Sequence, residues 1–151
     1  MDNQRHAGFA RRPTKMSFPA KILIVDDEPH VRAFLAKLAQ AHLGAAAVFE
    51  SSDAVSALES FQRERPDLVL LDTDLIGASG LEVLSQIRAL DDDVVVIMLS
   101  SVSAMGAIQA AVDRGANGYV LKNTGSEKVA QSLLEAVAQS FGDEDAAAGE
   151  L

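Results

Sequence analysis

The sequence contains no cysteine and no tryptophan, and only four prolines and one tyrosine among 151 residues. Without cysteine the chain can form neither a disulfide nor a thiolate metal site. Positive charge is also scarce, because 13 lysines and arginines stand against 22 aspartates and glutamates, and the net charge is −9. A chain this acidic is poorly suited to direct contact with nucleic acid or with an anionic membrane surface.

Long hydrophobic runs are missing as well. No apolar stretch approaches the roughly 18 residues that a membrane-spanning helix requires, and the N-terminus lacks the apolar segment of a signal peptide. We therefore expect a cytoplasmic protein without a membrane partner. The length and the 48% hydrophobic content are ordinary for one globular domain with a substantial core.

The two ends of the chain differ from its middle. Residues 1–19 are polar and basic and show no hydrophobic periodicity, which predicts a disordered basic arm. Residues 142–151 are acidic and rich in small residues, which predicts a flexible acidic tail. The folded domain is therefore expected to cover residues 20–141.

Within residues 20–141, apolar runs alternate with segments of helical periodicity. Continuous apolar runs are typical of strands buried on both faces. Five strands and five helices in strict alternation predict an α/β fold with a doubly wound parallel sheet. The expected strands are 21–25, 45–49, 68–71, 94–99 and 119–121, and the expected helices begin near Glu28-Pro29, Asp53, Ser79, Ala104 and Ser126.

Four of the expected strands end in polar residues of related chemistry. These residues are Asp26 and Asp27, Asp72, Ser100, and Lys122, in chain order. The carboxyl ends of parallel strands meet along one edge of the sheet, where ligands bind in such folds. The sequence therefore predicts a single site with three carboxylates, a hydroxyl and an ammonium group.

Such a site suits a divalent cation and a phosphoryl group. Adjacent carboxylates repel one another, and Mg²⁺ relieves the repulsion while binding carboxylates, waters and phosphate oxygens. Beside a metal, Asp72 could act as a nucleophile and form an aspartyl phosphate. Ser100 and Lys122 would then supply donors to the phosphoryl oxygens. Taken singly, each residue also has a structural interpretation, as a turn, cap or surface residue.

Four segments together resemble the receiver domain of two-component response regulators. They are residues 22–29, 66–72, 80–84 and 115–122. The stretch 99–124 is most similar to NarL/FixJ-type receivers, and the resemblance covers roughly residues 19–141. It implies a flavodoxin-like (βα)5 fold with five parallel strands in the order 2-1-3-4-5.

The resemblance also implies a role for each acidic residue. Asp72 would be the phosphoacceptor and would contact Mg²⁺ as well. Asp27 would bind Mg²⁺ directly and Asp26 through a water molecule. The backbone carbonyl of Asp74 would be a further metal ligand.

The remaining site residues would respond to phosphorylation. Ser100 would move to bond a phosphoryl oxygen, and Lys122 would pair with the phosphate. Tyr119 would be an aromatic switch that turns inward as Ser100 moves, although a half-buried strand tyrosine also explains it. The signal would leave through the face made by the helix near 104–114, the strand at 119–121 and the last helix.

The partners implied by the resemblance are proteins. A sensor histidine kinase or phosphotransfer protein would donate the phosphoryl group from a phosphohistidine, and a downstream protein target would bind the responding face. A homodimer is a further possibility. Because the domain would catalyse only its own phosphorylation and dephosphorylation, we do not expect a conventional enzyme.

The sequence departs from the family pattern at two positions. Ile76 and Asn123 stand where proline is usual, so the Lys122-Asn123 bond is expected to be trans, because a non-proline cis bond costs about 3–4 kcal/mol. Asp74 adds a carboxylate near the phosphoryl group, which we expect to alter the dephosphorylation rate. No output domain follows residue 151, so we expect a stand-alone receiver, with a receiver cut from a longer protein as the alternative.

Two other functions compete with this interpretation. Asp72-Thr73-Asp74 resembles the Asp-x-Asp motif of haloacid-dehalogenase-type phosphatases, yet in that family the metal-binding acidic pair follows the lysine, whereas Asp26 and Asp27 precede it. The other alternative is a receiver-like binding module that is never phosphorylated, which Ile76 and Asn123 favour.

Overall fold

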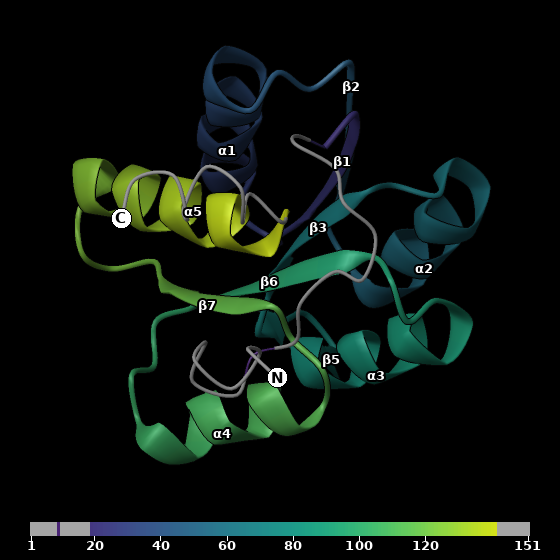
Figure 1. Cartoon of the computed structure of the whole chain (residues 1–151). Coiled ribbons are helices and arrows are strands. Elements are labelled where there is room, and N and C mark those ends of the chain that lie inside the picture. Colours follow the sequence, from purple (N-terminus) through teal and green to yellow (C-terminus); the bar gives the residue numbers. More distant parts are fainter. Residues whose placement is uncertain (1–8, 10–18, 142–151) are drawn as a thin grey trace.

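The computed structural model of the chain describes Phe9 and residues 19–141. The predicted acidic tail, and the predicted arm apart from Phe9 and Pro19, lie outside the described residues. A twisted central sheet carries helices on both of its faces (Figure 1). The elements are β1 (Lys21–Val25), α1 (Pro29–His42), β2 (Ala47–Ser51), α2 (Ala54–Glu64), β3 (Leu68–Asp72), β4 (Asp74–Leu75), β5 (Ala78–Ser79), α3 (Gly80–Leu90), β6 (Val95–Ser100), α4 (Met105–Asp113), β7 (Gly118–Leu121) and α5 (Ser126–Ser140).

The main sheet has five parallel strands in the order β2-β1-β3-β6-β7. This order confirms the predicted doubly wound fold and the strand order 2-1-3-4-5. Two short strands that were not predicted, β4 and β5, pair antiparallel in a separate two-stranded ladder directly after β3. The short ladder shapes the loop that follows Asp72.

Two apolar clusters fill the space between the sheet and its helices, and successive residues of each strand enter them alternately. Cluster A lies under α1 and α5 and contains Ile22 and Ile24 of β1. Cluster B lies under α2, α3 and α4 and contains Leu23 and Val25 of β1. Both faces of β1 are therefore buried, which explains why its sequence is a continuous apolar run.

Several helix ends follow the sequence signals. Pro29 is the first residue of α1, and the side chains of Asp53 and Ser79 cap α2 and α3 by accepting hydrogen bonds from backbone N–H groups. The last helix begins at Ser126 as predicted, but Ser126 is not the capping residue that its position had also suggested. Gly125, with φ of 99°, occupies the cap position and Ser126 is the first helical residue, because glycine tolerates this left-handed conformation.

Two further expectations need correction. The helical spacing of Met105, Ile108 and Val112 predicts that all three point inward, but Met105 is 76% exposed. Val55, which has helical spacing with Leu58 and Phe61, is 69% exposed. Both lie in the first turn of a helix. The second strand was expected at 45–49 and is found at Ala47–Ser51. Its register is set by pairing with all five residues of β1, and its own weakly strand-forming sequence did not reveal this.

Gly80 begins α3 in close contact with the end of β3. Its N–H donates to the carbonyl oxygen of Thr73 at 2.8 Å. A methyl group added at Gly80 would collide with the carbonyl oxygen of Asp72 and lie 2.8 Å from the Cα atom of Thr73. Only glycine allows α3 to start this close to Asp72.

We predict that Gly80→Ala lowers the free energy of unfolding by about 2 kcal/mol or more, because backbone atoms of β3 must move to admit the methyl group. Gly106→Ala in α4 is the matched control, since nothing lies within 4 Å of the added methyl group. It should leave stability unchanged or raise it by up to about 1 kcal/mol. Urea denaturation of both variants checks this, and equal stabilities would contradict it.

Candidate functional site

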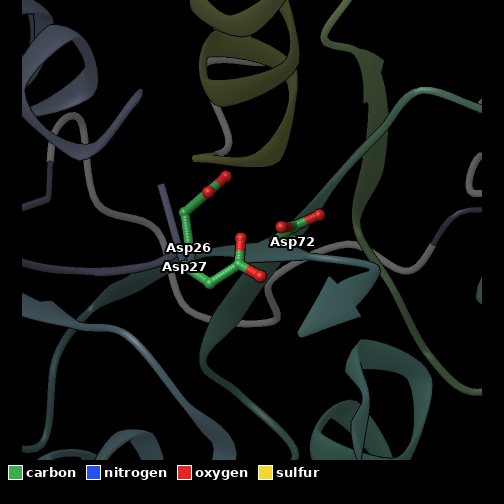
Figure 2. A group of neighbouring side chains, drawn as sticks. All are labelled: Asp26, Asp27 and Asp72. Carbon is green, nitrogen blue, oxygen red and sulfur yellow. The ribbon is translucent and has the colours of Figure 1, made fainter. Parts of the chain in front are cut away.

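Three carboxylates gather where β1 and β3 end, at the same edge of the sheet (Figure 2). Asp26 is fully buried, Asp72 is 2% exposed, and Asp27 is partly exposed. One carboxylate oxygen from each residue lies within 4.8 Å of the other two. The acidic cluster predicted from the strand ends is therefore present as a single group.

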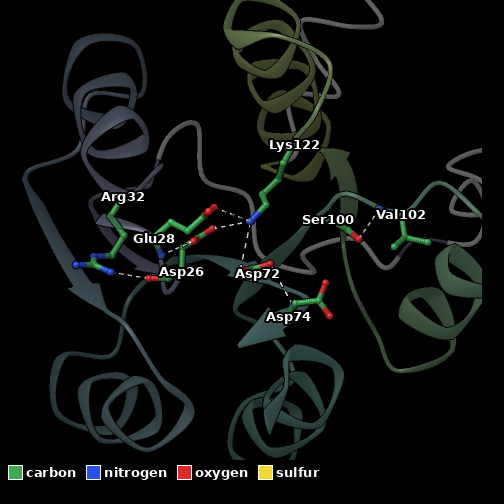
Figure 3. Close-up of polar contacts among 8 residues, drawn as sticks. All are labelled: Asp26, Glu28, Arg32, Asp72, Asp74, Ser100, Val102 and Lys122. Atoms are coloured by element: carbon green, nitrogen blue, oxygen red, sulfur yellow. Dashed lines mark hydrogen bonds and ion pairs between the residues drawn. The ribbon is translucent and has the colours of Figure 1, made fainter. Parts of the chain in front are cut away.

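The ammonium group of Lys122 lies between two of these carboxylates (Figure 3). Its Nζ atom is 3.0 Å from Oδ2 of Asp26 and 3.3 Å from Oδ2 of Asp72. The backbone N–H of Lys122 donates to the carbonyl oxygen of Ser100 at 2.8 Å, which continues the pairing of β6 with β7 beyond the last strand residue. The structure thus brings the ends of β1, β3 and β7 together through one side chain.

The second oxygen of each buried carboxylate accepts a backbone hydrogen bond. Oδ1 of Asp26 accepts from the N–H of Glu28 at 2.9 Å, and Oδ1 of Asp72 accepts from the N–H of Asp74 at 3.1 Å. Each bond joins a side chain to the backbone two residues later, so it closes a tight turn at the strand end. Both carboxylates are consequently held in one orientation.

Burial raises the pKa of Asp72 from its ordinary value of 3.8 to about 6. The negative charge of Asp26 acts in the same direction, whereas the hydrogen bond from Asp74 and the charge of Lys122 act against it. Burial alone would lower the pKa of Lys122. Its hydrogen bond to Asp26 and the charges of Asp72 and Asp26 have a larger effect, and together they raise the pKa of Lys122. At neutral pH, Asp72 is therefore mostly ionised and can act as a nucleophile.

Ser100 and Tyr119 both bond the backbone of Val102, in the loop between β6 and α4. The buried Ser100 hydroxyl accepts a hydrogen bond from the Val102 N–H at 3.0 Å (Figure 3). The Tyr119 hydroxyl donates to the Val102 carbonyl oxygen at 2.7 Å, and its ring packs against cluster B. A movement of the Val102 backbone therefore alters the surroundings of both side chains.

The loops around the site carry the two departures from the family pattern. Ile76 lies in the turn between β4 and β5 and is 74% exposed. The Lys122-Asn123 peptide bond is trans, as expected. The Asn123 side chain donates to the carbonyl oxygen of Ser101 at 3.3 Å, which ties the loop after β7 to the loop after β6.

Two residues at the site were missed by the sequence reasoning. The Arg32 guanidinium donates to the carbonyl oxygen of Asp26 at 2.7 Å and also pairs with Glu50. The Glu28 carboxylate lies 3.9 Å from the ammonium group of Lys122. Arg32 comes from the first turns of α1, and an isolated arginine in an amphipathic helix gives no signal that its side chain turns back to a strand end.

The donor set fits a hard divalent cation. Mg²⁺ ligands lie about 2.1 Å from the ion, so two of them are at most roughly 4.2 Å apart. The carboxylate oxygens of Asp26, Asp27 and Asp72 lie within 4.8 Å of one another, so a small closing movement would suffice. The cluster could thus hold a metal ion, for which the ammonium group of Lys122 now provides the compensating charge.

The fold and site define a doubly wound α/β protein with an acidic pocket at the carboxyl ends of its strands, and comparison with known proteins identifies the family. Residues 22–134 match the response regulator receiver domain, and the chain belongs to this family.

Individual relatives agree with this assignment. The chain is 34% identical over 119 residues to the nitrate/nitrite response regulator protein NarP of Escherichia coli, covering 79% of this chain and 54% of that protein. It is 33% identical over 102 residues to sporulation initiation phosphotransferase F of Bacillus subtilis, covering 68% of this chain and 81% of that protein. A crystal structure of a LuxR-family two-component response regulator from Aurantimonas superposes with a TM-score of 0.70 at 27% identity, covering 86% of this chain and 99% of that one.

The chain spans about half the length of the first curated relatives it matches, at 54% to 56% of each. The similarity to the NarL and NarP proteins confirms the expected type of receiver. Within the described residues, no helix is both long enough and apolar enough to cross a membrane.

We predict that the stability difference between Asp72→Asn and wild type depends on pH. The native pKa of Asp72 is raised to about 6 from 3.8. At a pH between these two values, Asp72 is therefore protonated in the native state and ionised in the unfolded state. Wild-type stability therefore falls as pH rises from about 4 to 6, by at most about 3 kcal/mol, and the asparagine variant lacks this loss. Urea denaturation at pH 4 and pH 7 measures the difference, and a difference independent of pH would contradict the prediction.

Proposed function

We propose that this protein is a phosphorylation-dependent signalling switch that accepts a phosphoryl group on Asp72 in an Mg²⁺-dependent reaction. The donor is a phosphohistidine of a sensor kinase or phosphotransfer protein. The observation that carries the proposal is the buried carboxylate of Asp72, held by Lys122 and adjoining Asp26 and Asp27. Membership in the receiver family supports it, as does similarity to a relative named as a phosphotransferase.

The chemistry at Asp72 is nucleophilic. The Oδ2 atom, which faces Lys122, attacks phosphorus as the bond from phosphorus to the histidine nitrogen breaks, and the released imidazole takes up a proton. Asp72 Oδ1 stays bonded to the Asp74 N–H and keeps the carboxylate aligned during the attack. The ammonium group of Lys122 lies 3.3 Å from Asp72, so it can stabilise the negative charge that develops on the phosphoryl oxygens. Bound Mg²⁺, held by Asp26, Asp27, Asp72 and the Asp74 carbonyl, would supply further neutralising charge.

Phosphorylation is sensed by the loop after β6. We expect the Ser100 hydroxyl to turn away from the Val102 N–H when it donates to a phosphoryl oxygen. The Val102 carbonyl holds the Tyr119 hydroxyl, so the same movement changes the position of the Tyr119 ring. The altered surface is the face formed by α4, β7 and α5, where we place the contact with a downstream protein.

Incubation with acetyl phosphate and Mg²⁺ tests the proposal. We predict that intact-mass analysis finds one added phosphoryl group on the wild-type chain and none on Asp72→Asn, because the amide is not a nucleophile. Asp74→Asn is the matched control, since it alters an exposed acid two residues away and should still be phosphorylated.

Other outcomes distinguish the alternatives. An adduct that persists on Asp72→Asn would overturn the assignment of Asp72. Catalytic release of phosphate from many substrate molecules would favour a phosphatase. A wild-type chain with neither adduct nor Mg²⁺ binding would favour an unphosphorylated binding module.

The exposed carboxylate of Asp74 offers a second prediction. It follows Asp72 by two residues and contributes negative charge close to the phosphoryl group, so we propose that it affects hydrolysis of the aspartyl phosphate. The phosphate half-life of Asp74→Asn should differ from that of the wild type by about threefold or more, because a charge this close shifts a barrier by roughly 1 kcal/mol. Equal half-lives after removal of the phosphodonor would show that Asp74 has no such role.

A further inference from the structure

Cluster B is covered unevenly by its helices, and α4 is the weakest cover. On the other face of the sheet, α1 and α5 bury large apolar side chains such as Leu35 and Leu133. Within α4, only the small residue Ala111 is buried, while Met105 at the start of the helix is 76% exposed. Part of cluster B therefore depends on apolar groups from outside α4 for its cover.

Phe9, which precedes the first strand of the sheet in the sequence, supplies one such group. Its side chain is partly buried and packs against cluster B, as do the partly buried Tyr119 and Leu81. A residue twelve positions before β1 thus contacts the same apolar cluster as Tyr119.

We propose that the N-terminal arm is an intramolecular ligand of this receiver, anchored by Phe9 on the α4 side of cluster B. Phe9 and Tyr119 pack against the same cluster, and Tyr119 belongs to the face that we assign to a downstream partner. A partner that approaches this face must displace the arm. Only this competitive consequence rests on the proposed function; the contact itself does not.

The length of the arm makes the contact feasible. The twelve Cα–Cα steps from Phe9 to Lys21 can reach roughly 40 Å, well beyond the roughly 17 Å spanned by a strand of five residues. Because the two groups belong to one chain, a short tether holds Phe9 at an effective concentration on the order of millimolar. A contact that would be weak between separate molecules is then populated.

The arm also has the charge expected of a ligand for an acidic protein. Residues 1–19 contain Arg5, Arg11, Arg12 and Lys15 against the single acid Asp2, whereas the whole chain has a net charge of −9. The rest of the chain is therefore strongly acidic, and long-range attraction favours arm association at low salt.

Paramagnetic labelling tests the contact directly, since a chain without cysteine accepts a nitroxide at one introduced thiol. We predict that a label on Ala10→Cys in the full chain attenuates the amide signals of Ala111 and Tyr119 several-fold more than those of Leu35 and Leu133. A second label on Gln4→Cys, further from Phe9, should give the same preference and shows that the label does not create the contact.

Substitution of Phe9 provides the decisive comparison. Phe9→Ala in the labelled chain should remove most of the preference for Ala111 and Tyr119. Val55→Ala is the control, because it truncates an apolar side chain that is 69% exposed and should leave the preference intact. Equal attenuation on both faces, or a preference that survives Phe9→Ala, would overturn the proposal. Neither Mg²⁺ nor phosphorylation is needed, so failure here and failure of the proposed function are separate results.

Discussion

The bridge from Lys122 to Asp26 and Asp72 is the interaction on which the rest of the site depends. β7 lies three places from β1 in the sheet, which corresponds to about 14 Å between strands. A long side chain from the loop after β7 closes this distance and compensates two carboxylates that are almost entirely buried. Removing the ammonium group would leave uncompensated buried charge, which is strongly unfavourable. The same burial raises the pKa of Asp72, so the groups suited to phosphoryl transfer also reduce stability at neutral pH.

Much of this arrangement could be predicted from the sequence, because the sheet topology alone brings the strand ends together. The doubly buried strands read as continuous apolar runs, and each of the residues Asp26, Asp72 and Lys122 directly follows one. What could not be predicted depends on contacts between distant segments. The β4–β5 ladder, the return of Arg32 to the carbonyl of Asp26, and the packing of Phe9 on cluster B leave no periodic signal in the chain.

In the proposed function, the backbone of one residue, Val102, joins the site to the signalling face. Its N–H is bonded to Ser100 and its carbonyl to Tyr119, so the position of one side chain constrains the other. In the neighbouring helix α4, Ala111 alone is fully buried, and few buried apolar groups are typical of an element that moves. Under the proposed function, coupling requires no long pathway, because a hydrogen bond exchanged at Ser100 would act directly on the loop that leads into α4.

The central claim is that the buried carboxylate of Asp72 becomes the acyl phosphate. Borohydride reduction after treatment with acetyl phosphate and Mg²⁺ tests it most directly, because reduction converts an aspartyl phosphate into homoserine and marks the position permanently. Peptide sequencing should then find homoserine at position 72. Homoserine at Asp26 or Asp27 instead, or its absence from a chain that had gained a phosphoryl group, would contradict the account.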